Sequence, residues 1–378
     1  MMLSMLRLYT AGDSHGVKLT GILEGLPSNL RVDLARVKNY LKRRRVFKGR
    51  SNRQMIEKDE FQIISGVEKD VTTGSPIACE IKNHSREKPA FPIYTPRPGH
   101  ADFSGFLKYQ HEDIRPVIER ASARETAIRT CLAGISSELP ISLGIKLMGF
   151  TERIGNMEVD EVEILEYDSK LEEIRDSSDF YFVQRERDKE AEKMLKEALE
   201  RKETLGGAVC IYAFGVPPGL GSYVHWERRI DSKIAAIMLS IPSVRGVEIG
   251  DAIKISKCFG KESVDEFSVE KDKISRKTNY QGGIEGGMTN GMPIKIRLFV
   301  KPIPTQLKSV KSFNLKSRIA EGTKYIRSDI CVVPAISVIG EVFLGLVLCD
   351  AILEKFGSDN FYEIMTSYER YMERLKWM

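Results

Sequence analysis

The stretch TAGDSHGVKLTGILEGLP, Thr10–Pro27, carries a histidine at the tip of a tight turn. Apolar or small residues alternate with polar ones on both sides of this turn, at Leu6, Leu8 and Thr10 before it and at Val17, Leu19, Gly21 and Leu23 after it. This period of two predicts two strands joined by Gly12–Gly16. A turn tip requires only residues that tolerate unusual backbone angles, which glycine, aspartate and serine do. His15 therefore needs a different explanation, and the two flanking glycines would let a ligand approach the backbone.

The composition is that of a globular protein. The chain has 378 residues, of which 42% are hydrophobic and 29% are charged, and its formal net charge is only +5. This length is enough for one large domain or two ordinary ones. We expect a single domain over residues 1–357, with a charged helical excursion at 152–205, and a helical tail over 358–378.

The cysteines and the apolar segments bear on the compartment. The six cysteines lie far apart, with no Cys-x-x-Cys pair and no histidine at metal spacing: Cys79, Cys131, Cys210, Cys258, Cys331 and Cys349. We therefore expect buried free thiols, no metal site and a cytoplasmic protein. The first residues are too short and too polar a run for a signal peptide. The longest apolar stretch, Ile330–Cys349, is interrupted by Pro334 and Glu341, so we expect no membrane span.

Strand-like and helix-like patterns alternate along the chain. Strands are predicted at Phe61–Val67, Ile77–Lys82, Ile141–Met148, Ala208–Phe214, Gly246–Ile255 and Ile294–Lys301. Helices are predicted at Leu34–Arg45, Arg120–Ser137 and about Asp188–Lys202. The alternation lacks the strict βαβ rhythm of a doubly wound sheet. The pattern favours an α+β fold of mixed, largely antiparallel sheets layered with helices.

The run KRRRVFKGRSNR, Lys42–Arg53, contains six cations after Lys42, at Arg43, Arg44, Arg45, Lys48, Arg50 and Arg53. Cations at a helix C-terminus offset the helix dipole, but so many repel one another unless an anion neutralises them. Guanidinium groups bind phosphate and carboxylate with paired hydrogen bonds. An anion site is the favoured interpretation, and a nucleic-acid-binding surface is the alternative.

A second cationic region spans RPGHAD, Arg97–Asp102, and the helix predicted from Arg120. Arg120 and Arg124 lie one turn apart near the predicted helix start, where cations are unfavourable unless an anion docks there. The alternative is a surface network that pairs Arg124 with Glu119 or Glu125. We favour the anion site.

Glycines crowd the segment GGIEGGMTNG, at Gly282, Gly283, Gly286, Gly287 and Gly291. This density favours backbone that wraps closely around a flat or phosphorylated ligand, with a flexible loop as the alternative. The order fits neither a Rossmann turn nor a P-loop. A predicted strand then leads to KPIPT, Lys301–Thr305, and further on RSD, Arg327–Asp329, places a cation next to a carboxylate.

Seven ordered motifs together resemble the chorismate synthase family: GDSHG, RPGHAD, SARETA, GVPPGLGSY, GGIEGGMTNG, KPIPT and RSD, within a likeness that runs from about Leu6 to Phe356. The resemblance implies a β-α-β sandwich, a homotetramer and flavin mononucleotide (FMN). It also implies a lyase of aromatic amino acid biosynthesis in the shikimate pathway. Its reaction is the 1,4-elimination of phosphate from 5-enolpyruvylshikimate 3-phosphate to give chorismate, with reduced FMN required. Some members reduce the flavin with NADPH and others rely on cellular reductants, and the resemblance leaves both open.

The resemblance also implies roles for individual residues. His15 is the acid for the leaving phosphate, His100 stabilises the reduced flavin as a monoanion, and Asp329 acts in removing the ring proton. The implied cofactor-binding residues are Arg120, Ala121, Ser122, Pro242, Ser243, Gly286, Lys301, Pro302, Ile303, Pro304, Thr305 and Arg327, with Arg44 and Arg50 at positions linked to a nicotinamide nucleotide. The implied substrate-binding residues are Arg44, Arg50, Arg53, Arg97 and Arg124.

Two other classes of protein could carry such motifs: a nucleic-acid-binding protein and a flavin-binding protein without catalysis. A nucleic-acid-binding protein would need aromatic residues interleaved with its cations, and only Phe47 interrupts the arginine run. Acidic residues are also nearly as numerous as basic ones, 53 against 58. A flavin-binding protein without catalysis would be favoured if His15, His100 or Asp329 were missing, and all three are present. The sequence therefore favours an enzyme that acts on a small molecule, with no nucleic-acid or membrane partner.

Overall fold

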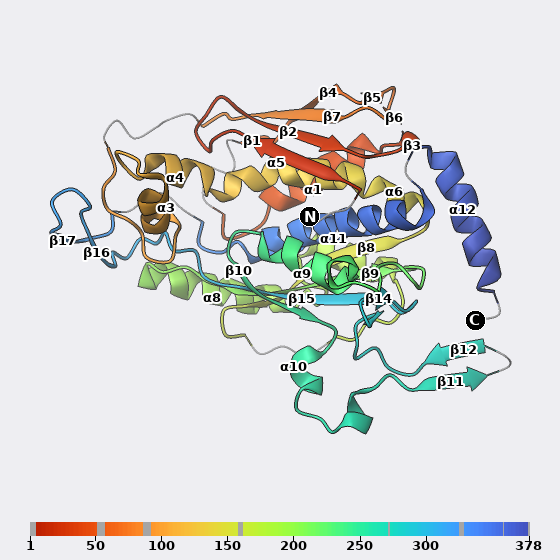
Figure 1. The fold of residues 1–378 in the computed structure, drawn as a ribbon. Coiled ribbons are helices and arrows are strands. Elements are labelled where there is room, and N and C mark those ends of the chain that lie inside the picture. Colours follow the sequence, from red (N-terminus) through yellow and green to blue (C-terminus); the bar gives the residue numbers. More distant parts are fainter. Residues whose placement is uncertain are drawn as a thin grey trace.

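Two antiparallel sheets enclose a layer of helices in a β-α-β sandwich (Figure 1). The computed structural model describes residues 5–50, 57–85, 92–157, 162–270, 273–324, 329–357 and 359–376. The expected α+β sandwich of antiparallel sheets is confirmed. Because both sheets turn one face to the helices, the sheets and helices together bury one continuous apolar core.

The first sheet contains the hairpin predicted around His15. Its strand order is β1-β2-β7-β4, formed by Arg7–Ala11, Lys18–Glu24, Ile77–Lys82 and Phe61–Ser65. In β2, Leu19 and Leu23 are fully buried, as the alternation predicts. Between them, a Cβ on Gly21 would lie 2.7 Å from side-chain atoms of Ile128 and Leu132. Glycine at this position therefore lets a helix pack closely against the strand.

The second sheet lies on the other side of the helices and has the order β10-β15-β9-β8, formed by Val244–Ile249, Ile294–Val300, Gly207–Phe214 and Lys146–Ile154. All of its pairings are antiparallel. The buried residues of β9 form a nearly continuous apolar run, because both faces of this sheet are covered. In β15 the buried run is broken by Lys295 and Arg297, which pair with Asp251 and with Glu152 and Glu248.

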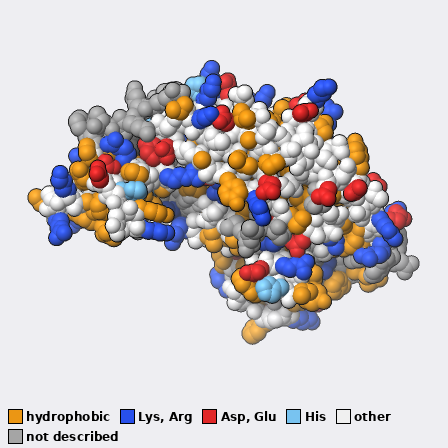
Figure 2. Space-filling view, turned by 45° about the horizontal axis from the view of Figure 1, so that its top comes forward, with side chains coloured by type: hydrophobic (Ala, Val, Ile, Leu, Met, Phe, Trp, Pro, Cys, Tyr) orange, Lys and Arg blue, Asp and Glu red, His pale blue; other side chains and the backbone are white. Residues whose placement is uncertain are grey.

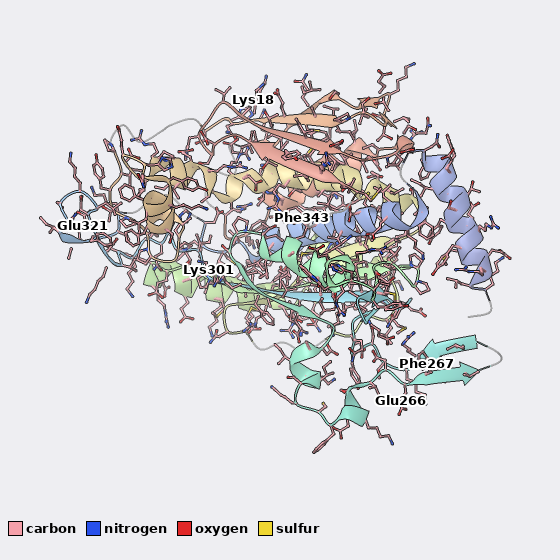
Figure 3. All side chains as sticks on the ribbon, in the orientation of Figure 1. Lys18, Glu266, Phe267, Lys301, Glu321 and Phe343 are labelled. Atoms are coloured by element: carbon pink, nitrogen blue, oxygen red, sulfur yellow. The ribbon has the colours of Figure 1, made fainter. Side chains whose placement is uncertain are left out.

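The middle layer contains α1 (Leu34–Arg45), α5 (Thr126–Ser136), α6 (Glu138–Ser142) and α11 (Val333–Phe356). Asp33 caps α1, as its position before the helix predicts, by accepting hydrogen bonds from the N–H groups of Ala35 and Arg36. Helix α11 is long and apolar enough to cross a membrane, but its most apolar window is wholly buried inside the fold. It is the central helix of the core, and Phe343 marks its position within the layer (Figure 3).

Three of the predicted elements are wrong in part. The run Ile141–Met148 is the end of α6 followed by the start of β8, with Gly144 at φ +90° between them, and periodicity cannot separate a buried helix from a buried strand in so short an apolar run. The run Gly246–Ile255 leaves the sheet at Gly250 and ends in the short helix α10 (Ala252–Ile255). The helix Arg120–Ser137 is interrupted, because Ser122 has extended backbone and caps a 3₁₀ turn before α5.

The charged excursion covers the outer face of the second sheet. It contains α7 (Ser169–Ser177) and α8 (Arg187–Arg201), so the prediction of helices there is confirmed. Residues of its first part, including Ile164 and Val183, pack on Phe150, Tyr212 and Phe214 of the sheet. These three aromatic rings stack in parallel, with neighbouring centroids 6.2 and 5.4 Å apart.

Shorter elements surround this sandwich. The strands are β3 (Ser28–Arg31), β5 (Val67–Glu68), β6 (Val71–Thr73), β11 (Phe267–Glu270), β12 (Lys273–Arg276), β13 (Ile284–Glu285), β14 (Met288–Thr289), β16 (Lys311–Phe313) and β17 (Ala320–Gly322). The helices are α3 (Asp102–Tyr109), α4 (Arg115–Arg120), η1 (Ala123–Glu125), η2 (Trp226–Arg228), α9 (Ile230–Leu239), η3 (Gly260–Ser263) and α12 (Phe361–Arg374). The β11–β12 hairpin, marked by Phe267, lies at the periphery (Figure 3).

The predicted C-terminal helix, α12, packs on the body of the protein. The Tyr368 and Tyr371 rings both meet Phe356 edge-on, at centroid distances of 5.5 Å, and the Tyr371 hydroxyl donates to the carbonyl of Pro218. The six cysteines are free thiols, and five of them are buried. Burial raises the pKa of Cys210 and Cys331 to about 12, so these thiols stay protonated.

The contact between α11 and β8 gives a stability prediction. A Cβ on Gly149 in β8 would lie 2.3 Å from the backbone oxygen of Ser337 in α11. We expect Gly149→Ala to lower the free energy of unfolding by roughly 1–3 kcal/mol, because helix and strand must separate. Gly260→Ala is the control, since no atom lies within 4 Å of its Cβ position and its φ is not positive. Denaturant unfolding measures both, and equal midpoints would show that the two backbones are not tightly packed.

Candidate active site

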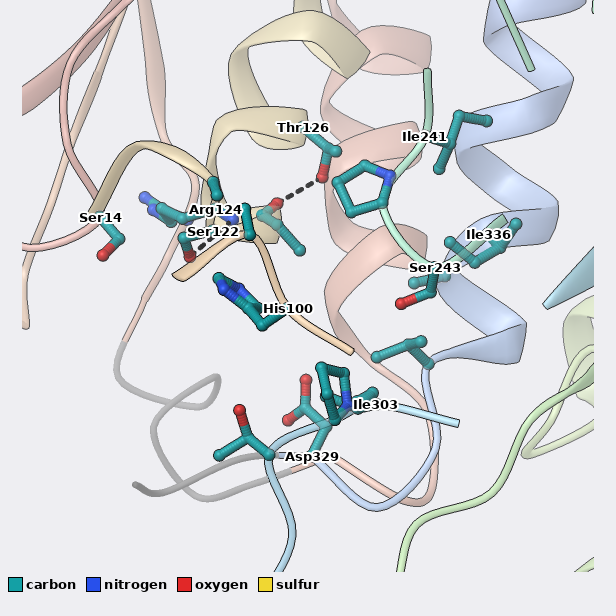
Figure 4. Close-up of a pocket in the computed structure, with 18 of the residues that line it drawn as sticks. Ser14, His100, Ser122, Arg124, Thr126, Ile241, Ser243, Ile303, Asp329 and Ile336 are labelled. Atoms are coloured by element: carbon teal, nitrogen blue, oxygen red, sulfur yellow. Dashed lines mark hydrogen bonds between the residues drawn. The ribbon is translucent and has the colours of Figure 1, made fainter. Parts of the chain in front are cut away.

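A pocket of about 310 Å³ opens at one end of the sandwich, where α1 ends and α5 and α11 begin (Figure 4). It brings together predicted site residues from segments far apart in sequence: His15, Arg44, Arg50, Arg97, His100, Ala121, Ser122, Arg124, Pro242, Ser243, Lys301, Ile303, Pro304, Thr305 and Asp329. The turn between β1 and β2 supplies His15, and the loop after β15 supplies Lys301, Ile303, Pro304 and Thr305. The sandwich therefore gathers at one end most of the residues that the sequence singled out.

Several predicted residues lie elsewhere. The Arg120 guanidinium donates to the carbonyls of Thr10 and Gly12, so it holds the β1–β2 turn and does not line the pocket. Gly286 lies in the β13–β14 turn at φ +59°, and neither it nor Pro302 lines the pocket. Arg53 and Arg327 lie outside the residues that the structure describes.

His15 is not an exposed turn residue, because its side chain is only 17% accessible. Its ring Nδ1 lies 2.9 Å from Glu119 Oε1 and 3.0 Å from the Ser14 hydroxyl oxygen. Its backbone N–H donates to Glu119 Oε2 over 2.7 Å. Burial raises the pKa of Glu119, but the hydrogen bonds from His15 and Ser14 outweigh it and lower that pKa to about 2. Glu119 is thus a carboxylate at neutral pH.

His100 has a similar neighbour. Its Nδ1 lies 2.5 Å from Asp102 Oδ1. The same carboxylate accepts hydrogen bonds from Arg97, whose Nη1 also donates to Thr305. Burial raises the pKa of Asp102, whereas the hydrogen bonds from His100 and Arg97 lower it well below its usual range. The motif RPGHAD thus folds into a compact ionic cluster against the KPIPT loop.

A second buried ionic cluster contributes Arg44 and Arg124 to the pocket. Asp59 accepts a hydrogen bond from Arg44 over 3.1 Å and another from Arg124, which also donates to Asn83 and Glu57. Burial lowers the pKa of Arg44 to about 10. Burial also raises the pKa of Asp59, but the two guanidinium groups lower it below its usual value. The alternative interpretation, a surface network of Arg124 with Glu119 or Glu125, does not describe this arrangement, because Arg124 is 7% exposed and pairs with Asp59 and Glu57.

Arg50 and Asp329 form an ion pair within the pocket, with 2.6 Å between Nη1 and Oδ2. The Arg50 guanidinium also lies 4.7 Å from the centroid of the Phe47 ring, and its Nη2 donates to the carbonyl of Arg44. These contacts hold both charges at the wall of the pocket, where each side chain is 10% accessible. Asp329, 279 positions away in the sequence, therefore comes close to Arg50 only in the folded chain.

The remaining wall is apolar and faces two helix N-termini. The apolar side chains that line it are Ile118, Ile241, Ile303, Val332, Ala335, Ile336 and Ile339. Ser243 has φ +76°, an unusual backbone conformation for a residue with a side chain, of the kind that clusters at ligand sites. The first turns of α5 and α11 point their N–H groups toward this end of the sandwich, which favours bound anions. The pocket thus combines a flat apolar surface with cations.

Two guanidinium groups of the arginine run, among its described residues, are buried in the fold. Arg43 and Arg44 are 6% and 3% exposed, and Arg43 pairs with Glu341 of α11. Buried guanidinium groups cannot follow a phosphate backbone. On the face shown in Figure 2, basic side chains are also interspersed with acidic and apolar ones.

Comparison with known proteins identifies the family. The model of the family described as Chorismate synthase matches residues 6–353. The chain belongs to the chorismate synthase family. It is 42% identical to "Chorismate synthase" of Carboxydothermus hydrogenoformans, over 98% of this chain and 99% of that protein, and 41% identical to that of Aquifex aeolicus over the whole of both chains. A solved structure described as "Crystal Structure of Chorismate Synthase" superposes with a TM-score of 0.82, at 37% identity, over 100% of both chains.

Sequence reasoning missed the acidic half of this chorismate synthase family site. Glu57 and Asp59 lie in an ordinary charged stretch with no motif of their own, and the sequence offered Glu119 only as a surface partner of Arg124. The available signal was the surplus of pocket cations, since buried charges must be paired. That surplus predicts acidic partners but cannot say which of the 53 acidic residues supply them.

The buried ionic cluster gives a second prediction. Asp59→Asn keeps the shape and tolerates the positive φ of +52°, but it leaves Arg44 and Arg124 without their shared charge. We expect the free energy of unfolding to fall by roughly 3–5 kcal/mol. The control is Glu24→Gln, which removes the exposed pair with Arg7 and should change it by less than ~0.5 kcal/mol. Urea unfolding at pH 7 measures the free energy of unfolding of both variants. Equal losses in the two would contradict the role of Asp59 as the shared partner of Arg44 and Arg124.

Proposed function

We propose that this protein is a chorismate synthase that eliminates phosphate from 5-enolpyruvylshikimate 3-phosphate in a 1,4 sense, with reduced FMN, and releases chorismate. The observation that carries the proposal is the pocket itself. It places four arginines, two histidines and the Asp329 carboxylate around an apolar wall, in a chain that matches the family along its length. A substrate with one phosphate and two carboxylates needs such a set of cations.

The residues present fit FMN. A flat ring system can lie against Ile241, Ile303 and Ile336, while Lys301 and the hydroxyl of Ser122 provide polar groups at the edge. When bound, reduced FMN supplies an electron to the substrate and takes it back, so the overall reaction is redox-neutral. Arg120 and Gly286 do not line the pocket in this structure. Their contacts with FMN are proposed for a conformation in which their segments lie closer to the pocket.

The arginines bind and orient the substrate in this proposal. Arg97 and Arg124 keep their planes fixed through Asp102 and Asp59, and Arg44 is held by Thr126 and Asp59. A guanidinium that is already oriented loses less conformational entropy when it binds an anion. Arg50 and, in the segment outside the described residues, Arg53 complete the proposed substrate-binding set.

The proton transfers are assigned to three residues. His15 donates a proton to the phosphate oxygen as the carbon–oxygen bond breaks, because an imidazole titrates near neutral pH. Asp329 takes the ring proton, and His100 stabilises negative charge on the ring system that lies against the apolar wall.

Further parts of the proposal concern the environment of the enzyme. We place the enzyme in the cytoplasm. We also propose that it assembles as a homotetramer. Exposed apolar side chains of the first sheet support association between subunits: Tyr9, Ile22 and Ile64 are 64%, 42% and 53% exposed. NADPH binding at Arg44 and Arg50 is proposed as one of two routes to reduced flavin, and supply by cellular reductants is the other.

Turnover tests the proposed function. The protein is incubated anaerobically with the substrate and chemically reduced FMN, and then aerobically with NADPH and oxidised FMN. Chorismate in the first assay is the expected result, and chorismate in the second would add flavin reduction to the activity. Flavin binding without any chorismate would instead identify a binding protein and remove the proposal.

The role of His15 gives a third prediction. We expect His15→Ala to lower kcat by ~10²–10⁴-fold, because the leaving phosphate loses its proton donor. The substrate KM should change far less, since the arginines remain. His15 is bonded to Glu119, so the substitution also removes a contact of the turn. Circular dichroism therefore checks that the variant folds. A folded variant with the wild-type rate would contradict the assignment.

Shared cations give a fourth prediction. We expect FMN to bind more tightly in the presence of the substrate, because both anionic molecules occupy one pocket and each orders its walls for the other. Isothermal titration calorimetry with and without the substrate measures this coupling. Equal FMN affinity in the two titrations would argue against one shared site.

A further inference from the structure

The hydrogen bonds around Glu119 single it out among the carboxylates near the pocket. Its Oε1 lies 2.9 Å from His15 Nδ1, and its Oε2 accepts hydrogen bonds from the backbone N–H of His15 and from the Ser14 hydroxyl, over 2.7 and 2.8 Å. Its own backbone carbonyl accepts from the N–H of Ser14 over 3.3 Å. Both carboxylate oxygens are therefore committed to the GDSHG turn, 104 residues away in the sequence.

The end of α4 holds this turn as a unit. Glu119 is 5% exposed, and the next residue, Arg120, donates to the carbonyls of Thr10 and Gly12. Asn83 also donates to the carbonyls of Asp13 and Gly16, so the turn is bonded through its backbone on both sides of His15. With the backbone held in this way, the bond from Glu119 Oε1 to the ring fixes the direction of the imidazole.

This bond also determines which ring nitrogen is available. A neutral imidazole carries one N–H, and a carboxylate accepts it, so the neutral ring bonded to Glu119 carries its hydrogen on Nδ1. The other nitrogen, Nε2, lies on the far side of the ring, and His15 lines the pocket. The same arrangement of a carboxylate behind a histidine orients the base of serine hydrolases.

We propose that Glu119 is a positioning residue for His15, which holds the imidazole so that Nε2 is presented to the substrate phosphate. The proposal rests on the proposed function, in which His15 protonates the leaving phosphate. In that step, the carbon–oxygen bond breaks, its electron pair stays with the phosphate oxygen, and the proton moves from His15 Nε2 to a phosphate oxygen. His15 is left neutral with its N–H on Nδ1, still bonded to Glu119.

Glu119 can be tested without disturbing the arginines. Among the described residues, its side chain bonds only to Ser14 and His15. Asp102, the carboxylate behind His100, also holds Arg97, so replacing it would alter the proposed substrate-binding residues. Glu125 offers a matched control, since it accepts a hydrogen bond from Thr10 of the same hairpin over 2.7 Å but has no bond to His15.

Steady-state kinetics compare Glu119→Gln, Glu119→Asp and Glu125→Gln. For Glu119→Gln we expect kcat to fall on the order of 10- to 100-fold, as for other carboxylates that orient a histidine, with KM changed less than threefold. Glu119→Asp keeps the charge and should recover part of the loss. Glu125→Gln should keep the wild-type kcat.

The pH profile gives a readout that a purely structural role would not change. In the proposal His15 acts in its protonated form, so activity falls toward high pH. Removing the adjacent negative charge favours the neutral ring, so this falling limb should move to lower pH in Glu119→Gln. The other ionisable groups that line the pocket are unchanged in the variant: Glu57, Arg44, Arg50, Arg97, Arg124, His100, Lys301 and Asp329.

A spectroscopic measurement separates this proposal from the proposed function. In ¹⁵N-histidine-labelled protein, His15 resonances are assigned by their loss in His15→Ala. The wild type should show the Nδ1–H tautomer when neutral, and Glu119→Gln should lose that preference. If wild-type protein makes no chorismate, the proposed function fails, while the tautomer still reports on Glu119. An unchanged tautomer together with unchanged kcat and pH profile overturns the positioning role, and if Glu119→Gln does not fold, Glu119→Asp serves the same comparison.

Discussion

The burial of α11 on every side is the constraint on which the rest of this structure depends. A 24-residue helix with apolar residues all round can be stable in water only when it is enclosed, and the second sheet encloses it together with α1, α5 and α9. Because the helix runs through the middle layer, its N-terminus lies at one end of the sandwich. The loops that connect the layers meet at that end, and they contribute the residues of the pocket.

Charge pairing is the second constraint, and it follows from the first. A pocket enclosed by apolar helices cannot hold unpaired cations. Each pocket arginine therefore has a carboxylate partner: Arg44 and Arg124 pair with Asp59, Arg97 with Asp102, and Arg50 with Asp329. The carboxylates keep each guanidinium oriented while the anionic ligands of the proposed reaction are away. The same rule accounts for His15, whose partner is Glu119.

Much of the fold was predictable where the pattern was long or repeated. The helix Leu34–Arg45, its Asp33 cap, the strands at Ile77–Lys82 and Ala208–Phe214, and the hairpin around Gly12–Gly16 all follow from local periodicity and turn chemistry. The prediction was wrong at Ile141–Met148 and Gly246–Ile255, where an apolar run crosses from one element to another. In both, a glycine with positive φ makes the change, and residue type alone does not reveal that conformation.

The sequence by itself determined the class of fold, the family, and which residues carry titratable or cationic groups, because these depend on periodicity and on motifs of adjacent residues. Only the tertiary structure decided which charges meet. His15 and Glu119, Arg124 and Asp59, and Arg50 and Asp329 are separated by 104, 65 and 279 positions, and no local pattern connects them. The physical reason is that a buried charge selects its partner by distance and geometry in the packed chain, and these arise only when all layers are assembled.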